Sequence, residues 1–166
     1  MLPPLLLTGG PAVGKTVTAQ ALAETTSRCA YLDVDDIRQL VRNGAAAPWA
    51  GAEGVAQQRL GVRNAAALAR NFGACGFTVT ISDVVDGETL ILYRKLLPDV
   101  VVVRLTASLL EASRRARLRP MYLTDEEFQM LHSTQEDFLA VDHQLDVTHM
   151  DSTEQVRHVR ALWTRN

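Results

Sequence analysis

Short apolar runs alternate along this chain with longer segments in which apolar residues recur at helical spacing. The run Val100–Leu105 is almost wholly β-branched, which is typical of a central parallel strand that is buried on both faces. Three further runs predict buried strands: Leu5–Thr8, Cys29–Leu32 and Phe77–Asp83. A weaker last strand is predicted at Leu145–Thr148.

Helices are predicted between these strands. Five follow from periodicity and good helix formers, over residues 16–23, 37–42, 53–71, 90–97 and 107–119. Capping boxes at Thr124–Glu127 and Ser152–Gln155 open two more. Strands that alternate with helices predict a three-layer α/β fold with a central five-stranded parallel sheet. With 166 residues and no internal repeat or linker, we expect a single domain over residues 1–166.

Composition narrows the class of protein. Hydrophobic residues make up 47% of the chain and charged residues 22%, which is ordinary for a globular protein. The net charge of −2 argues against a nucleic-acid partner, because such proteins carry a basic surface. No apolar stretch approaches the ~20 residues of a membrane span. Cys29 and Cys75 have no partner at metal-ligand spacing, which indicates free thiols. We therefore expect a cytoplasmic protein with no membrane partner.

A phosphate-binding motif follows the first predicted strand. Residues 9–16 match the pattern G-x-x-x-x-G-K-[ST], in the strand–loop–helix context that the motif requires. Glycines leave the backbone amides open to an anion, and the helix N-terminus favours negative charge. We expect Lys15 to contact the β- and γ-phosphates and Thr16 to bind Mg²⁺. The residues predicted to bind a nucleoside triphosphate, ATP or GTP, are Gly9, Gly10, Pro11, Ala12, Val13, Gly14, Lys15 and Thr16.

Acidic residues follow the second and third predicted strands. Ligands of such sheets bind beyond the carboxyl ends of the strands. We expect Asp33 and Asp83 to serve Mg²⁺ and Asp35 to orient or deprotonate an attacking hydroxyl. Asp36 and Asp86 are expected to bind the acceptor and are the alternative bases, although a helix cap accounts equally well for Asp36.

An arginine cluster follows the fourth strand. It suits a lid over about residues 114–135 that closes on the triphosphate, with a solvated helix face as the alternative. We expect catalytic roles for Arg115 and Arg119, and nucleotide binding by Arg117. Further candidates for the acceptor side are Arg38, Trp49, Arg59 and Arg63, with a buried core position as the alternative for Trp49.

These features together resemble the small P-loop kinases of the nucleoside-monophosphate-kinase-like fold, and among them the chloramphenicol phosphotransferase-like group. The resemblance implies ATP-dependent phosphorylation of a small-molecule hydroxyl, with antibiotics among the substrates. It also implies a helical lid whose arginines correspond to Arg115, Arg117 and Arg119, and a Mg²⁺-associated acid at Asp83.

Two other groups resemble the chain at its acidic segment. Asp35-Asp36-Ile37-Arg38-Gln39 resembles polynucleotide 5′-hydroxyl kinases, which implies Asp35 as the base and Arg38 as the holder of a substrate phosphate. The spacing Asp33-x-Asp35 is similar to that of shikimate kinases, which implies a metal role for the first acid and substrate contact for the second. The chain lacks the basic surface of the former group and the glycine-rich substrate motif of the latter.

The sequence therefore predicts an ATP-dependent phosphotransferase that acts on an antibiotic, a nucleoside-like compound or a metabolite. The alternatives are a P-loop NTPase that drives a partner, a nucleotide-binding protein that has lost catalysis, and a polynucleotide 5′-hydroxyl kinase-like enzyme. A guanine-reading N-K-x-D segment, which a switch GTPase needs, is absent. The acceptor, the choice between ATP and GTP, and the oligomeric state stay open at this point.

Overall fold

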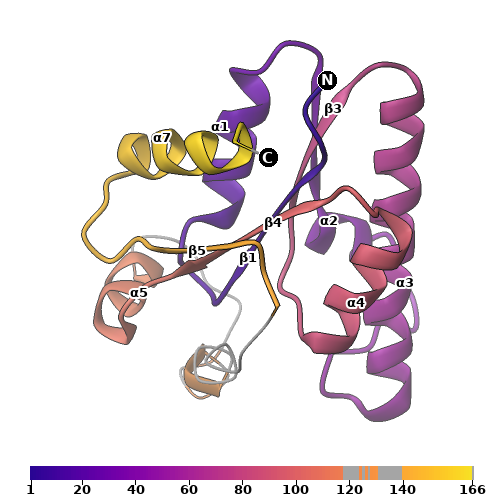
Figure 1. The fold of residues 1–166 in the computed structure, drawn as a ribbon. Helices are drawn as coiled ribbons and strands as arrows, with labels where there is room; N and C mark the ends of the chain where they lie inside the picture. The colour runs from indigo at the N-terminus through magenta and orange to yellow at the C-terminus, as the bar shows by residue number, and fades with distance from the viewer. Residues whose placement is uncertain (118–123, 125, 127, 131–139, 166) are drawn as a thin grey trace.

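A five-stranded parallel sheet forms the centre of the fold (Figure 1). The computed structural model describes residues 1–117, 124, 126, 128–130 and 140–165. The strands pair in the order β2-β3-β1-β4-β5. Their bounds are Leu5–Gly9 for β1, Cys29–Asp33 for β2, Thr78–Ser82 for β3, Val101–Thr106 for β4 and His143–Asp146 for β5. The predicted five-stranded parallel sheet is confirmed.

Helices cover both faces of this sheet, as Figure 1 shows. One face carries α1 and α7, and the other carries α2, α3 and α4. In β1, Leu6 faces the core under α3 and α4, whereas Leu5 and Leu7 face the core under α1 and α7. The bounds are Lys15–Glu24 for α1, Val34–Arg38 for α2, Gly51–Ala74 for α3, Gly87–Leu96 for α4, Leu109–Ala116 for α5 and Ser152–Trp163 for α7.

Several predicted helix boundaries were wrong because caps, not apolar periodicity, set them. The helix predicted from residue 37 begins at Val34, since the Asp33 side chain accepts a hydrogen bond from the backbone N–H of Asp35. Helix α4 begins three residues earlier than predicted, because Asp86 and Thr89 form a capping box. The cap of α7 is Asp151, paired with Glu154, one residue before the predicted box.

Other differences concern the ends of α3 and the predicted lid. Helix α3 extends from Gly51 to Ala74, so Gly73 lies inside the helix instead of introducing the next strand. Of the predicted lid, residues 114–117 close α5, and residues 126 and 128–130 are helical. Residues 118–123, 125, 127 and 131–135 of that lid lie outside the described residues. None of the described helices is long and apolar enough to cross a membrane.

Candidate functional site

The phosphate loop connects β1 to α1 at the carboxyl end of the sheet. Gly9 and Gly14 have φ angles of 139° and 92°, in the region that favours glycine. A Cβ at Gly9 would also collide with the backbone carbonyl of Leu105 on the neighbouring strand β4. Lys15 lies across the loop and donates from Nζ to the carbonyl oxygen of Gly10 over 2.7 Å. The loop therefore has the glycine-dependent shape that the motif predicts.

Gln155 of α7 supports the phosphate loop from behind and was missed by the sequence analysis. Its buried Nε2 donates to the carbonyl oxygen of Val13 at 3.1 Å and to Oγ1 of Thr18 at 2.8 Å. A Cβ at Gly14 would lie 2.8 Å from the same Nε2, so the glycine makes room for the amide. The sequence carried no direct signal for this contact, because it joins residues that are 142 positions apart. The sequence alone indicated Gln155 only as part of a capping box.

Helix α5 lies next to the apex of the phosphate loop. Ala12, with a φ angle of 58°, packs against an apolar cluster of Ala112, Ala116 and Phe128. The helix that opens the arginine-rich segment is thereby placed beside the loop that would bind the triphosphate.

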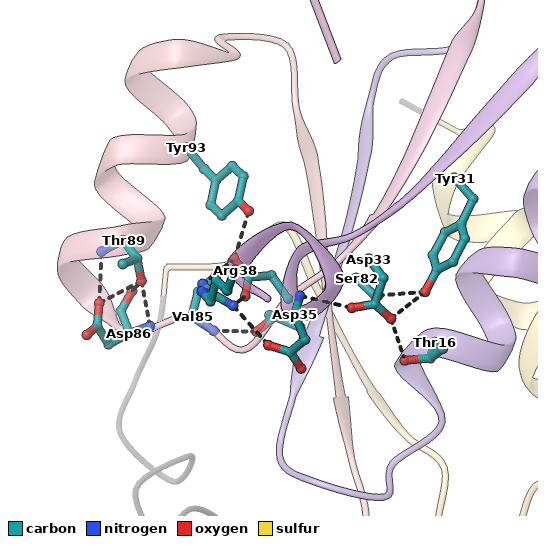
Figure 2. Close-up of polar contacts among 12 residues, drawn as sticks. Thr16, Tyr31, Asp33, Asp35, Arg38, Ser82, Val85, Asp86, Thr89 and Tyr93 are labelled. Carbon is teal, nitrogen blue, oxygen red and sulfur yellow. Dashed lines mark hydrogen bonds and ion pairs between the residues drawn. The ribbon is translucent and has the colours of Figure 1, made fainter. Parts of the chain in front are cut away.

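Asp33 at the end of β2 and Thr16 in the first turn of α1 are joined by a hydrogen bond (Figure 2). Thr16 Oγ1 donates to Asp33 Oδ2 over 3.3 Å, and the Tyr31 hydroxyl donates to the same Oδ2 over 2.8 Å. Burial, reinforced by the nearby Asp33 carboxylate, raises the pKa of Tyr31 to about 12, so its hydroxyl stays a proton donor at neutral pH. The Tyr31 hydroxyl also lies 3.0 Å from Oγ of Ser82. A hydroxyl and a carboxylate oxygen this close fit the hard oxygen ligands that Mg²⁺ prefers.

Asp35 lies in the first turn of α2, after its N-cap Asp33, and faces solvent. Its backbone N–H donates to Asp33 Oδ1 over 3.0 Å, while its own side chain is 72% exposed. The cap therefore fixes the position of Asp35 relative to the Thr16–Asp33 pair and leaves its carboxylate accessible. The Oδ1 atom of Asp35 accepts a hydrogen bond from Nη1 of Arg38 over 3.1 Å.

A buried ion pair lies behind Asp35. Arg38 donates from Nη1 to Asp83 Oδ1 over 2.7 Å and from Nη2 to Asp83 Oδ2 over 3.2 Å. The Tyr93 hydroxyl of α4 donates to Asp83 Oδ2 over 2.7 Å. Burial raises the pKa of Asp83, and the charge and hydrogen bonds of Arg38, with the bond from Tyr93, oppose that rise. Figure 2 shows Arg38 between Tyr93 and Asp35.

This ion pair bears on the Mg²⁺ role predicted for Asp83. Its side chain has no exposed surface, and both of its oxygens face the guanidinium of Arg38, which already balances its charge. A metal ligand needs an available lone pair facing the ion, so this placement argues against a Mg²⁺ role for Asp83. Tyr93 was missed; a lone tyrosine among the apolar residues of α4 was the available signal.

Of the other predicted acceptor-side residues, Asp36 neighbours Asp35, whereas no hydrogen bond or ion pair among the described residues joins Trp49, Asp86, Arg59 or Arg63 to Asp35. Asp36 is exposed in the first turn of α2, and Trp49 is 49% exposed in the loop before α3. Asp86 caps α4 by accepting from the backbone N–H of Thr89 over 2.8 Å, which accounts for its carboxylate without an acceptor.

Arg59 and Arg63 lie on the far side of α3 from Arg38. Gly61 faces Arg38, since a Cβ there would lie 2.9 Å from Nε of Arg38. Positions 59 and 63 are each two residues away, which is about 200° around the helix. Arg59 donates to Glu88 of α4 over 2.6 Å, and Arg63 is exposed. The predicted acceptor roles of these two arginines therefore lose their geometric basis.

The described arginines of the predicted lid make mainly structural contacts. Arg115 donates to Glu111 over 2.7 Å and to the carbonyl oxygens of Val147 and Met150 over 2.8 and 3.1 Å. It thereby ties α5 to the connection between β5 and α7, which argues against the catalytic role predicted for it. Hydrogen bonds from Arg114 and Arg115 lower the pKa of Glu111 to about 2. Arg117 is exposed at the end of α5, and Arg119 lies outside the described residues.

Comparison with known proteins supports the architecture. No protein-family model matches the chain, and no curated protein matches its sequence. Among solved structures, a sugar kinase from Janibacter sp. superposes with a TM-score of 0.73 at 14% identity, covering 99% of this chain and 95% of that chain. The fold is that of the P-loop small-molecule kinases.

Two further structures agree with this assignment. Shikimate kinase from Acinetobacter baumannii, in complex with shikimate, has a TM-score of 0.73 at 17% identity and covers 100% of this chain and 95% of its own. The tunicamycin resistance protein of Deinococcus radiodurans has a TM-score of 0.71 at 17% identity, with coverage of 98% and 95%. At these identities the likeness establishes the fold alone. The narrower resemblance to the chloramphenicol phosphotransferase-like group stays a prediction.

Proposed function

We propose that this protein is an ATP-dependent phosphotransferase that moves the γ-phosphoryl group of ATP to a hydroxyl of a small molecule. The observation that carries the proposal is that Asp33, the N-cap of α2, contacts both Thr16 and Asp35. One oxygen of Asp33 lies 3.3 Å from Oγ1 of Thr16, and the other accepts from the backbone N–H of Asp35. A metal-side acid and a solvent-facing acid are thus held in fixed relation beside the phosphate loop.

The nucleotide side of the reaction is assigned to the phosphate loop. Backbone N–H groups of residues 9–16 other than Pro11, together with the N-terminus of α1, would bind the phosphates. Lys15 would exchange its contact with the Gly10 carbonyl for a phosphate oxygen. Thr16 and Asp33 would hold Mg²⁺ with the nucleotide. When bound, Mg²⁺ neutralises charge on the β- and γ-phosphate oxygens.

Asp35 is assigned to the acceptor. A bond forms between the acceptor oxygen and the γ-phosphorus, the bond from that phosphorus to the β–γ bridging oxygen breaks, and ADP leaves. The hydroxyl proton passes to the Asp35 carboxylate. Phosphoryl transfer has a loose transition state, so Asp35 mainly positions the hydroxyl and accepts the proton late. Such a base contributes typically ~10²–10⁴-fold to the rate.

The stabilisation of negative charge on the transferred phosphoryl group is assigned to the arginines that follow α5. Arg117 is exposed at the end of that helix, beside the cluster that packs on Ala12. Arg119 stays a candidate by its sequence position. Arg115 would act through structure, by holding α5 in place. Arginine at this point would stabilise charge that builds on the phosphoryl group.

The proposal places the protein in the cytoplasm, where ATP is available, as a single kinase domain. An antibiotic stays among the candidate acceptors, because one structural neighbour is a tunicamycin resistance protein. Sugars and small hydroxy acids are the other classes suggested by the neighbours.

A transfer screen tests this function. The protein, Mg²⁺ and either ATP or GTP are incubated with a panel of hydroxylated antibiotics, nucleosides, sugars and hydroxy acids, and products are detected by mass spectrometry. We expect one panel member to gain a single phosphoryl group with the wild-type protein and none with Lys15→Ala. Release of inorganic phosphate without transfer to any member, at a rate that Asp35→Asn leaves unchanged, would indicate an NTPase instead.

A further inference from the structure

The Arg38 guanidinium has no free pair of parallel N–H groups with which to bind an anion. Arginine recognises carboxylates and phosphates best through two parallel N–H groups on one edge of the guanidinium. In Arg38 the edge formed by Nη1 and Nη2 is taken up by the two oxygens of Asp83, at 2.7 and 3.2 Å. Nη1 donates in addition to Asp35.

The second edge of the guanidinium is covered by α3. Nε of Arg38 is buried and has no hydrogen-bond partner among the described residues. Gly61 lies against it, since a Cβ at Gly61 would come within 2.9 Å of that nitrogen. Nε, one of the two donors on this edge, is therefore covered by α3 and closed to a ligand. Arg38 serves the buried ion pair and offers no two-pronged site to an anionic acceptor.

The surroundings of Arg38 are negatively charged. Residues 33–38 and 83–88 contain six carboxylates and a single basic residue, Arg38. Glu88 is balanced by Arg59, and Asp83 by Arg38 itself. Asp35 and Asp36 are both exposed on α2. Arg38 is the single cation of these two described segments and is shared between Asp83 and Asp35, so an anionic group on an acceptor bound beside Asp35 would face an excess of negative charge from them.

From these contacts we propose that the acceptor is a polyhydroxylated small molecule, uncharged or amine-bearing, that carries no carboxylate or phosphate group. This inference rests on the proposed function, and it names the substrate class of the same site. Specificity arises from repulsion: an anionic acceptor is rejected by Asp35 and Asp36, and a neutral polyol hydrogen-bonds to them. Acceptors such as a hydroxy acid or a nucleotide 3′-phosphate are thereby excluded.

The kinetic test uses matched derivatives of the acceptor found by the transfer screen. Derivatives carry a carboxylate or an amine at a position away from the phosphorylated hydroxyl, and kcat/KM is measured for each. We expect the carboxylate derivative to be poorer than the parent by about tenfold or more, and the amine derivative to equal or exceed the parent. A carboxylated or phosphorylated acceptor that outperforms its uncharged counterpart would overturn the proposal.

A second test needs no acceptor and therefore separates this inference from the proposed function. Cationic and anionic nitroxide probes are added to the isotopically labelled protein, with and without Mg²⁺ and a non-hydrolysable ATP analogue. Paramagnetic relaxation is then measured at the backbone amide protons of residues 35–38. We expect stronger relaxation by the cationic probe in both states. Equal relaxation by the two probes, or stronger relaxation by the anionic one, would refute the inference even if transfer is observed.

Two charge-neutralising variants serve as the matched pair in both tests. Asp36→Asn removes one exposed carboxylate from the proposed repulsive wall, so it should reduce the preference for the cationic probe and the penalty on the carboxylate derivative. Glu24→Gln removes the same charge at the C-terminal end of α1 and should change neither. A Glu24→Gln effect as large as that of Asp36→Asn would show that net charge, not this wall, controls selection. If no hydroxyl is phosphorylated but the probe result holds, the proposed function fails and the charge assignment stands.

Discussion

Arg38 and Asp83 form a two-pronged ion pair between residues that are 45 positions apart in the sequence. The pair joins the short helix α2 to the end of β3, and Tyr93 adds a hydrogen bond from α4. Asp35 meets the outer side of the same guanidinium. The acid proposed to activate the acceptor is thus supported by a buried ion pair, which contains the Asp83 carboxylate that the sequence analysis assigned to Mg²⁺.

Asp83→Asn should destabilise the protein by about 3 kcal/mol, because it leaves the largely buried charge of Arg38 without its main counter-ion. The melting temperature should fall by about 6–12 °C for a chain of this size. Tyr93→Phe is the matched control, since it removes one hydrogen bond and keeps both charges, with an expected cost of about 1 kcal/mol. Calorimetric melting compares the two. A loss no larger in Asp83→Asn than in Tyr93→Phe would contradict the ion-pair interpretation.

Asp33→Asn should raise the Mg²⁺ concentration needed for half-maximal activity by about tenfold or more, because Asp33 lies against Thr16 at the proposed metal position. Asp83→Asn, measured below its melting temperature, should leave that concentration unchanged. A Mg²⁺ titration of initial rates checks both variants. The opposite order would restore Asp83 as the metal-side acid and remove Asp33 from that role.

Asp35→Asn should lower turnover by ~10²–10⁴-fold with little change in nucleotide affinity, because the amide keeps the size of the side chain and loses the basic oxygen. Asp36→Asn, on the next residue of the same exposed turn, should retain most of the turnover for a neutral acceptor. Steady-state kinetics with the identified acceptor distinguish the two. Full activity of Asp35→Asn would move the base to Asp36 or Asp86.

Lys15→Ala should abolish nucleotide-dependent activity and leave the fold intact, since Lys15 contributes a phosphate contact and is not a core residue. Binding of a non-hydrolysable ATP analogue is measured by isothermal titration calorimetry, with the melting temperature as the folding control. Unchanged affinity together with unchanged turnover would refute the assignment of residues 9–16.

The sequence predicted the parts of the site that depend on local spacing. The phosphate loop, the strand before it and the helix after it are consecutive, so one motif defined them. The neighbourhood of Asp33 and Thr16 was also predictable, because both follow parallel strands whose carboxyl ends meet at one edge of the sheet.

The rest of the site depends on which strands are neighbours. Strands β2 and β3 pair so that Asp33 lies opposite Ser82, which places Asp83 one residue beyond and within reach of Arg38. Apolar periodicity carries no information about that order. The Mg²⁺ role of Asp83 was predicted from its position at the end of a strand and from the resemblance to P-loop kinases. The contact between Gln155 and the phosphate loop spans 142 positions and depends in the same way on how α7 packs against α1.

The most direct measurement is a crystal structure of the complex with Mg²⁺, a non-hydrolysable ATP analogue and the acceptor identified by the transfer screen. The account predicts that the reactive hydroxyl lies within about 2.6–3.2 Å of an Asp35 carboxylate oxygen. It also predicts that this hydroxyl is in line with the bond from the γ-phosphorus to the leaving oxygen, and that Mg²⁺ contacts Thr16 beside Asp33. An acceptor hydroxyl held by a different carboxylate, or a metal bound at Asp83, would contradict the account.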